Sequence, residues 1–539
     1  GKSSNFTQNF SRISFGNCIR NSYRDYFKNS LQQSVRNPTR SLTRISFSTL
    51  LKASPRSLQE FLPVFLGATS DSRIPSGIPT IISPGNFSGI FPGFFQKFHP
   101  GFLRELLLAA RLSTVSRPLI MMSSTGETIA CNHRDTVAVD WRHLDFYRDV
   151  VSQDLGLPED EICLRNLSVT NATDGQSGFT SLLHRVLVDV QLKNGECVQR
   201  SYVVKENSND AIGGNVEENL ALFEKEIEVF QKLIPEFEKL FQHKVKFGPR
   251  FHKAVKSPST VIVMEDLNAS GYIMRSSSNR LNLSDSRAVL SRLAKFHAAS
   301  AVYTKQNELY SKFFGSGMFD GDTASGAETY LTNLIKSYVT SLRERNCCNE
   351  FLDLISQWNK NLYVVGAELF RLNDKDFNVL NHGDLWMNNM MFSESDLLMI
   401  DFQIAFYGSF SFDLLQFILC TVEVDAIVNK FDELIEFYYQ ELQDAFRILD
   451  QTTLLPSLEN LTADIDRHGF FAAILLVEAI PLMSYMTVGQ LNMDLMSSSE
   501  LEGAEFRRKL YHNDIFVDVV DRLLPFLFER GYLKYSVNV

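Results

Sequence analysis

The sequence predicts an α+β fold of two lobes, a small β-rich lobe followed by a larger, mainly helical one. Three strand-like segments follow one another between residues 162 and 204, and helical patterns dominate from residue 283 onward. Residues 379–403 combine short apolar strands with a polar loop, which indicates a site in the second lobe. We assign residues 122–267 to the first lobe, residues 268–539 to the second, and residues 1–121 to an extension that precedes both.

The extension differs in composition from the rest of the chain. Residues 1–120 contain 15 Lys or Arg against 4 Asp or Glu, whereas the whole chain has a net charge of −10. A basic, Ser-rich and acid-poor segment is typical of a mitochondrial transit peptide. A non-native extension is the plainer explanation, because an ordinary globular pattern begins only after Met121-Met122. We expect residues 1–121 to be mostly disordered and to carry no chemistry.

Charge and cysteine content narrow the class of protein. The acidic balance argues against a general nucleic-acid binder. Seven cysteines are scattered without a CxxC pair, and no apolar run approaches the roughly 20 residues of a membrane-spanning helix. An odd number of cysteines without a secretory signal suggests reduced thiols, so we expect a cytoplasmic protein without a transmembrane segment. The oligomeric state cannot be read from the sequence.

The first lobe contains a pattern that suits a nucleotide. A helix is predicted over residues 143–155, and strands over 162–170, 182–192 and 197–204, the last ending at Lys205. The loop between the first two strands carries Gly175 and Gly178, which let backbone N–H groups approach phosphates. Lys205 can pair with the same phosphates. Taken alone, such glycines are usually turn residues and such a lysine is usually a solvated surface charge. The order of strand, glycine loop, strand, turn and a third strand ending at Lys205 favours a nucleotide site.

A helix over residues 215–233 supplies a partner for Lys205. Its apolar face lies next to Glu226, whereas Glu224 falls nearer the polar side. Either glutamate alone could be a surface charge, and we prefer Glu226. Pro235 is expected to end or interrupt this helix. Strands over 250–254 and 260–264 then lead into residues 265–272, a hinge where backbone groups around Glu265 and Leu267 could bond an adenine.

The second lobe reads as helices around the polar loop. A helix over 283–303 is capped by Ser284 or Asp285, and its His297 is expected to be a packed core histidine. Further helices are predicted over 327–342, 350–365, 426–448, 470–486 and 516–527. Pro481 is expected to break the helix over 470–486. Apolar, aromatic helices beside the loop could line a pocket for a lipophilic alcohol. For any single residue, however, a place in the hydrophobic core is the simpler interpretation.

The polar loop holds three residues whose chemistry fits phosphoryl transfer. Asn389 follows Asp384 by five positions, and Asp401 stands at the end of the next strand. Transfer from a nucleoside triphosphate to a hydroxyl needs a carboxylate facing the acceptor and oxygen ligands for magnesium. The alternative is that His382-Gly383-Asp384 is only a turn and Asp401 only a strand cap. The combined spacing favours the site.

The segment after Asp401 indicates the size of the acceptor. Asp413 follows Asp401 by only twelve positions, and no Ala-Pro-Glu ends a long loop there, unlike in protein kinases. Gly383 and Gln403 also depart from the protein-kinase pattern. Asp413 is expected to cap a helix, with a brace to the catalytic loop as the alternative. We therefore predict a small-molecule acceptor rather than a polypeptide.

Residues 122–539 resemble the ecdysteroid kinase-like (CHK kinase-like) family of arthropods, relatives of the choline and aminoglycoside kinases. The resemblance rests on Val203-Val204-Lys205, Phe223-Glu224-Lys225-Glu226, Met264-Glu265-Asp266-Leu267, Leu293–Ala298, His382–Asn389 and Asp401-Phe402-Gln403. It implies a bilobal protein-kinase-like fold and ATP- and Mg²⁺-dependent phosphorylation of a hydroxyl on a small molecule, with ecdysteroids as the named substrates.

The resemblance also implies roles for individual residues. Asp384 would orient and deprotonate the acceptor hydroxyl, and His382 would support the loop. Asn389 and Asp401 would hold magnesium. The nucleotide would be held by Lys205 with its partner Glu226, by the loop of Gly175 and Gly178, and by the hinge at Glu265 and Leu267. Two alternatives stay open: a catalytically silent binder of a lipophilic metabolite, and a choline or ethanolamine kinase, which would need groups that cage a quaternary amine.

Overall fold

The computed structural model describes residues 140–172, 181–207, 221–256, 259–276, 279–307, 310–315, 324–358 and 362–535. All of them belong to one compact unit, Cys131–Val539. The predicted extension, residues 1–121, and the glycine loop with Gly175 and Gly178 lie outside the described residues. The expectations for both stay predictions.

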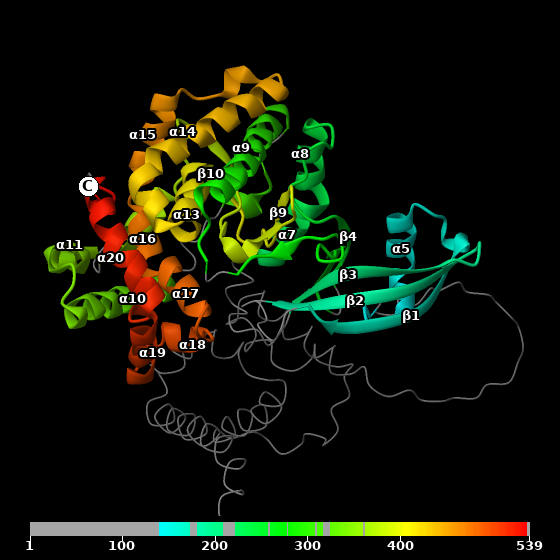
Figure 1. The fold of residues 1–539 in the computed structure, drawn as a ribbon, viewed down its shortest axis with the longest axis horizontal. Helices are drawn as coiled ribbons and strands as arrows, with labels where there is room; N and C mark the ends of the chain where they lie inside the picture. The colour runs from blue at the N-terminus through cyan, green and yellow to red at the C-terminus, as the bar shows by residue number, and fades with distance from the viewer. Residues whose placement is uncertain are drawn as a thin grey trace, which may run out of the picture. The chain divides into compact units, whose positions relative to one another are not determined.

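The first lobe is built on a five-stranded antiparallel sheet in the order β1-β2-β3-β5-β4 (Figure 1). Its strands are β1 (Ile162–Asn171), β2 (Ser181–Leu192), β3 (Cys197–Asn207), β4 (Phe251–Val255) and β5 (Val261–Glu265). Gly195, with φ +89°, makes the tight turn between β2 and β3. Strand β3 runs past the predicted end at Lys205, because its last residues pair with both β2 and β5.

Alternation along the strands sends two kinds of side chain to opposite faces. Val186, Val188 and Val204 are buried in one cluster with the helix α5 (Arg148–Leu155), which follows the turn η3 (Leu144–Tyr147). Lys205, the next residue along β3, therefore points to the other face. That face is the one where the helix with Glu226 packs.

The helix carrying Glu226 continues beyond the predicted break. Helix α7 (Leu222–Glu228) is joined to α8 (Ile234–Leu240) by the π-helical turn η5 (Val229–Leu233). Pro235, in the first turn of α8, has no N–H to donate, and the wider π turn directly before it accommodates that loss. Pro235 thus interrupts the helix without ending it.

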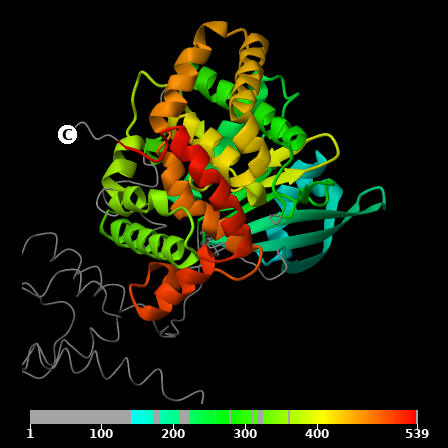
Figure 2. The same ribbon diagram turned by 60° about the vertical axis from the view of Figure 1, so that its left-hand side comes forward.

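The second lobe is mainly helical and is shown from two sides in Figures 1 and 2. Its helices are α9 (Leu283–Gln306), α10 (Ala324–Arg345), α11 (Leu352–Trp358), α12 (Leu362–Leu369), α13 (Ser411–Thr421), α14 (Val424–Ile448), α15 (Leu458–His468), α16 (Phe471–Val477), α17 (Ala479–Met486), α18 (Met493–Ser497), α19 (Leu501–Tyr511) and α20 (Asp514–Glu529). The predicted cap of α9 is wrong: Asn282 accepts the N–H of Asp285. This small β-rich lobe and larger helical lobe confirm the predicted fold class.

Short strands frame the polar loop. Strand β7 (Asn378–Asn381) pairs antiparallel with β10 (Phe406–Ser409), and β8 (Met390–Phe392) lies between β6 (Ile273–Met274) and β9 (Leu397–Met399). The loop between β7 and β8 and the end of β9 are therefore held at neighbouring positions. These are the segments that carry Asp384, Asn389 and Asp401.

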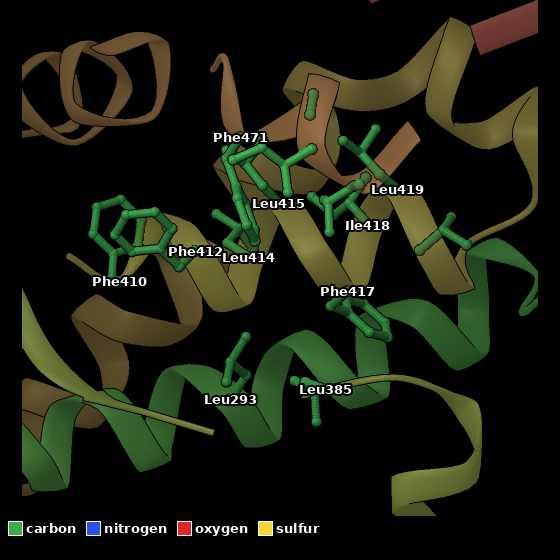
Figure 3. Packing of buried hydrophobic residues seen from close by; sticks show 14 of the residues in the cluster. Leu293, Leu385, Phe410, Phe412, Leu414, Leu415, Phe417, Ile418, Leu419 and Phe471 are labelled. Carbon is green, nitrogen blue, oxygen red and sulfur yellow. The ribbon is translucent and has the colours of Figure 1, made fainter. Parts of the chain in front are cut away.

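Helix α13 anchors this region in the core. All of its residues are buried except the half-buried Cys420. Figure 3 shows Phe417 pointing toward α9, the helix that carries Leu293, while Leu415 and Ile418 point to the opposite side, where Phe471 of α16 lies. A helix buried on every face is enclosed by neighbours, so its position relative to the loop is fixed.

In the described part of the chain, no single helix is long and apolar enough to cross a membrane. The bent pair formed by Leu458–His468 and Phe471–Met486 meets that test by length and composition only, as a buried core helix also can.

Candidate active site

The polar loop leaves β7 through a turn that only glycine fits. Gly383 has φ +81°, and a Cβ placed on it would lie 2.5 Å from the carbonyl oxygen of Ile404. Strand β7 is itself tied to α9, because the N–H of Leu380 donates to Ser300 Oγ at 2.6 Å. The loop is thus held both by close packing and by a hydrogen bond to a long helix.

Asp413 braces the loop by accepting hydrogen bonds from its backbone. Its Oδ2 accepts the N–H of His382 at 2.6 Å, and its Oδ1 accepts the N–H of Gly383 at 2.9 Å. His297 Nε2 lies 3.3 Å from the same carboxylate, and its Nδ1 lies 2.8 Å from the hydroxyl of Tyr438. Phe410 stands at the N-cap of α13, so the expected cap role of Asp413 is wrong and the bracing alternative is right. His297 is the buried core histidine that its pattern indicated.

His382 joins the loop to the end of β9. Its Nε2 donates to the carbonyl oxygen of Ile400 at 2.9 Å, and its Nδ1 accepts the N–H of Asp384 at 3.3 Å. One ring nitrogen donates and the other accepts, which is the pattern of neutral imidazole. Burial lowers the pKa of His382, in agreement with a neutral ring.

Asp384 stands in a half-buried position and accepts three side-chain hydrogen bonds. Asn389 Nδ2 donates to Oδ2 at 2.8 Å, Trp386 Nε1 donates to the same oxygen at 3.3 Å, and Gln416 Nε2 donates to Oδ1 at 3.3 Å. Burial and the charge of Asp401 raise the pKa of Asp384 to about 7, although the hydrogen bonds from Trp386 and Asn389 oppose the shift. A carboxylate held in this way can accept a proton near neutral pH.

Asn389 and Asp401 present oxygen atoms beside that carboxylate. Both hydrogen bonds of Asn389 Nδ2 go to Asp384, one to Oδ2 and one to the backbone oxygen, each at 2.8 Å. The amide is therefore oriented, and its Oδ1 is the atom left to face a ligand. Asp401 has φ +66° at the end of β9, an αL conformation that aspartate tolerates, and its carboxylate is partly exposed. Amide and carboxylate oxygens fit a hard cation such as Mg²⁺.

Lys205 connects the sheet to this group. Its Nζ lies 2.5 Å from Glu226 Oε2, 2.7 Å from Asp401 Oδ1 and 3.4 Å from Gln403 Oε1. Burial lowers the pKa of Lys205, but Asp401 and Glu226 outweigh it, so the pKa lies above its ordinary value and the lysine is charged. Glu224 instead lies 3.7 Å from Lys256 at the surface. The structure therefore pairs Lys205 with Glu226.

The hinge residues pack on the hairpin that separates Asn389 from Asp401. Leu267 forms a small buried cluster with Met391 and Leu398 of β8 and β9. The carboxylate of Glu265 accepts bonds from the Ser270 hydroxyl and from the backbone N–H of Arg250. Leu267 thus contacts the second lobe through this hairpin, whereas the hydrogen bonds of Glu265 stay within the first lobe and the hinge.

Two polar residues of this region were not predicted. Gln416 is one of the few polar side chains on the apolar helix α13, and Glu478 is the only charged residue between Phe470 and Met486. A lone polar residue in an apolar run is the sequence signal that could have identified both. Gln416 contacts Asp384 and Glu478 contacts Tyr330, and both contacts depend on helix packing, which the sequence does not show.

Comparison with known proteins identifies related sequences and folds. A model of the ecdysteroid kinase-like family matches residues 175–451. A comparison with curated proteins gave no match. Among solved structures, a choline kinase from Cryptosporidium parvum Iowa II is 13% identical with a TM-score of 0.36, covering 72% of this chain and 96% of its own. An amicoumacin kinase in complex with AMP-PNP, Ca²⁺ and Ami is 13% identical with a TM-score of 0.29, covering 64% of this chain and 87% of its own. A choline/ethanolamine kinase family protein from Mesorhizobium loti is 11% identical with a TM-score of 0.27, covering 67% and 92%.

Proposed function

The chain belongs to the ecdysteroid kinase-like family, and on that premise we propose that it transfers the γ-phosphoryl group of ATP to a hydroxyl of a small lipophilic molecule. One observation carries the proposal. Lys205 of the sheet contacts Glu226 on one side and Asp401 on the other, 196 positions away in the chain. A buried lysine shared in this way suits the phosphates of a nucleotide.

Asp384 would act on the acceptor. An acceptor hydroxyl that donates a hydrogen bond to Asp384 would give up its proton to that carboxylate as its oxygen attacks the γ-phosphorus, while the bond from that phosphorus to the bridging oxygen breaks and ADP leaves. The side-chain donors Trp386, Asn389 and Gln416 hold the carboxylate in one orientation. The raised pKa of Asp384 makes it a better proton acceptor than an exposed aspartate.

Four residues would bind the phosphates and the metal of the nucleotide. Lys205 would exchange Asp401 for phosphate oxygens while Glu226 keeps its ammonium in place. Asp401 and Asn389 would then hold Mg²⁺, which when bound neutralises charge on the phosphates. The hinge at Glu265 and Leu267, and the loop with Gly175 and Gly178, would receive the rest of the nucleotide.

The short segment between Asp401 and the start of α13 favours a small acceptor. Strand β10 pairs with β7 within a few residues of Asp401, and α13 begins directly afterwards at Ser411. Protein kinases use a long loop in this place to dock a polypeptide. We propose an ecdysteroid or another lipophilic alcohol as the acceptor. The cytoplasmic location stays a prediction, in keeping with five described cysteines that form no disulfide.

The experiment is an ATP-dependent phosphorylation assay of the full chain with an ecdysteroid, choline, ethanolamine and a panel of small alcohols. Asp384→Asn should lower kcat about 10²- to 10⁴-fold, the contribution typical of general-base catalysis, and leave nucleotide affinity unchanged. Asp401→Ala should weaken nucleotide binding only when Mg²⁺ is present. The matched control is Asp444→Asn, an exposed carboxylate on α14.

Two results would contradict the proposal. Near wild-type turnover by Asp384→Asn would remove the assigned base. Tight binding of apolar ligands without phosphorylation of any acceptor would instead favour a catalytically silent binder. Turnover of choline or ethanolamine alone would move the acceptor class to small amino alcohols.

A further inference from the structure

Cys347 and Cys348 are the only two neighbouring cysteines of the sequence, and they stand in the turn between α10 and the short helix η8 (Asn349–Phe351). Both are free thiols and half-buried, and their Sγ atoms lie 3.1 Å apart. Side chains of adjacent residues normally point apart, to opposite faces of a strand or about 100° apart around a helix. The contact between these two thiols therefore needs a particular backbone.

The backbone of the turn supplies it. Asn346 has φ +52° and Cys348 has φ +55°, so residues in the left-handed region stand on both sides of Cys347. Asparagine tolerates this conformation, whereas for cysteine it is strained. The N–H of Cys347 donates to the carbonyl oxygen of Leu342 at 3.3 Å, and the N–H of Phe351 donates to that of Cys348 at 3.0 Å. These bonds tie the turn to the helices on either side, so the fold holds the two thiols together.

Two thiols so close can share a metal ion or form a disulfide, and their surroundings favour the disulfide. Two thiolates on one tetrahedral zinc ion, with Zn–S bonds of about 2.3 Å, lie about 3.8 Å apart. A carboxylate oxygen of Asp521, on α20, lies within 4.8 Å of both sulfur atoms and would be a third ligand. Both oxygens of Asp521 already accept hydrogen bonds from Arg345 Nη1, at 2.8 and 3.0 Å. The charge that would attract a cation is therefore compensated.

The two thiols differ in how firmly they hold their protons. Burial and the neighbouring Cys347 raise the pKa of the Cys348 thiol. Cys348 therefore keeps its proton when Cys347 has lost its own. Exchange between a thiol and a disulfide begins with attack by a thiolate. Cys347 is thus the residue that attacks, and Cys348 is the residue that resolves the mixed disulfide.

We propose that Cys347 and Cys348 form a redox site, which a low-molecular-weight disulfide oxidises to a disulfide between the two neighbouring residues. The Cys347 thiolate attacks one sulfur of the small disulfide, its S–S bond breaks, and one small thiolate leaves. Cys348 then loses its proton and attacks the Cys347 sulfur, and the second small thiolate leaves. The two protons from the cysteines pass to the two small thiolates. Two thiols of the chain are oxidised while one small disulfide is reduced, and the proposed kinase activity is not involved.

The new bond is expected to be easily reduced. The Cα atoms of adjacent residues lie about 3.8 Å apart, whereas the usual range for disulfides begins at about 4.4 Å. A disulfide outside that range is strained, and strained disulfides are the labile, regulatory ones rather than the structural ones. The site should therefore be oxidised only while small disulfides are abundant.

The test treats the reduced full chain with glutathione disulfide, blocks the remaining thiols with N-ethylmaleimide and maps the tryptic peptides by mass spectrometry. Cleavage after Arg345 and Lys360 gives a peptide that contains both Cys347 and Cys348 and no other cysteine. The variants are Cys347→Ser and Cys348→Ser. Cys163→Ser, at an exposed position of β1, is the control.

In the wild type and in Cys163→Ser, this peptide should lose two hydrogen atoms and take up no N-ethylmaleimide. Reduced glutathione should return it to the dithiol. Cys348→Ser should stop at the mixed disulfide, with one glutathione on Cys347, because the resolving thiol is gone. Cys347→Ser should react at least about tenfold more slowly, because burial keeps Cys348 protonated and the rate follows the thiolate fraction.

Three results would overturn the inference. A glutathione adduct that persists on wild-type Cys347 would show that Cys348 does not resolve it. Two molecules of N-ethylmaleimide on the treated wild-type peptide, while the exposed Cys163 gains glutathione, would show that the pair is inert. Zinc that stays bound to the wild type in native mass spectrometry and is lost in both serine variants would assign a metal site. The wild-type peptide map needs no variant, so it decides the proposal even where a serine variant is unstable.

Discussion

Replacing Asp413 by asparagine tests whether the loop depends on its brace. In the wild type one carboxylate oxygen accepts two hydrogen bonds, from the N–H of His382 and from His297, and the other accepts the N–H of Gly383. Asparagine keeps one oxygen, which can serve His382 and His297. Its NH₂ group then faces the N–H of Gly383, across the distance of 2.9 Å that the hydrogen bond spans in the wild type.

The expected cost follows from that geometry. One charge-assisted hydrogen bond is lost and one backbone donor is left unpaired, so the free energy of unfolding should fall by about 2 to 3 kcal/mol. Because the loop that carries Asp384 loses part of its support, kcat should fall. KM for ATP should stay unchanged, because Lys205 and Glu226 are untouched. Urea unfolding of the full chain, followed by tryptophan fluorescence, measures the first quantity. Asp444→Asn is the surface control, and an unfolding midpoint for Asp413→Asn equal to that control would refute the bracing role.

Two further predictions concern the same loop. Gly383→Ala should destabilise the protein by more than about 2 kcal/mol, because it adds a clash with the Ile404 carbonyl to the cost of a positive φ. Gly531→Ala, at φ +79° with open space around it, should show the backbone cost alone, and equal losses of stability would exclude the clash. His382→Gln should flatten the loss of stability in acid. Burial lowers the pKa of His382 in the folded state, so the unfolded chain takes up the proton first and stability falls as the pH drops below about 6.5. The slope from one histidine is at most about 1.4 kcal/mol per pH unit, and parallel wild-type and variant curves between about pH 7 and pH 5 would show that His382 does not contribute.

The fold was predictable where local patterns agree with tertiary contacts. The alternation of β2 and the Asn-Gly turn after it define a hairpin in one register only, and the structure has that hairpin. Glu226 was predictable for a similar reason. It lies next to the apolar face of α7, and when that face is buried the Glu226 side chain also points inward, toward Lys205.

Other features depend on contacts that no local pattern contains. Asn282, Ser284 and Asp285 are all good capping residues, and the bridge between Leu281 and Val422 places the first of them at the start of α9. Asp413 likewise reads as a cap, because its brace to the loop joins segments thirty residues apart. Gln416 reaches Asp384 only through the packing of α13.

The contacts of Lys205 with Asp401 and Gln403 have a mechanical consequence. Of the contacts described for the site, those of Asp384, His382 and Asn389 stay within the helical lobe, while Lys205 reaches Asp401 and Gln403 from the sheet. A rotation of the sheet lobe about residues 265–272 would therefore break the contacts of Lys205 with the helical lobe. The half that faces the acceptor would remain assembled. Lys205 would leave, whereas Glu226 stands on a helix whose continuation packs Phe230 against Phe402 of the helical lobe. An acceptor would then not have to wait for the nucleotide, and the two substrates could be taken up in either order.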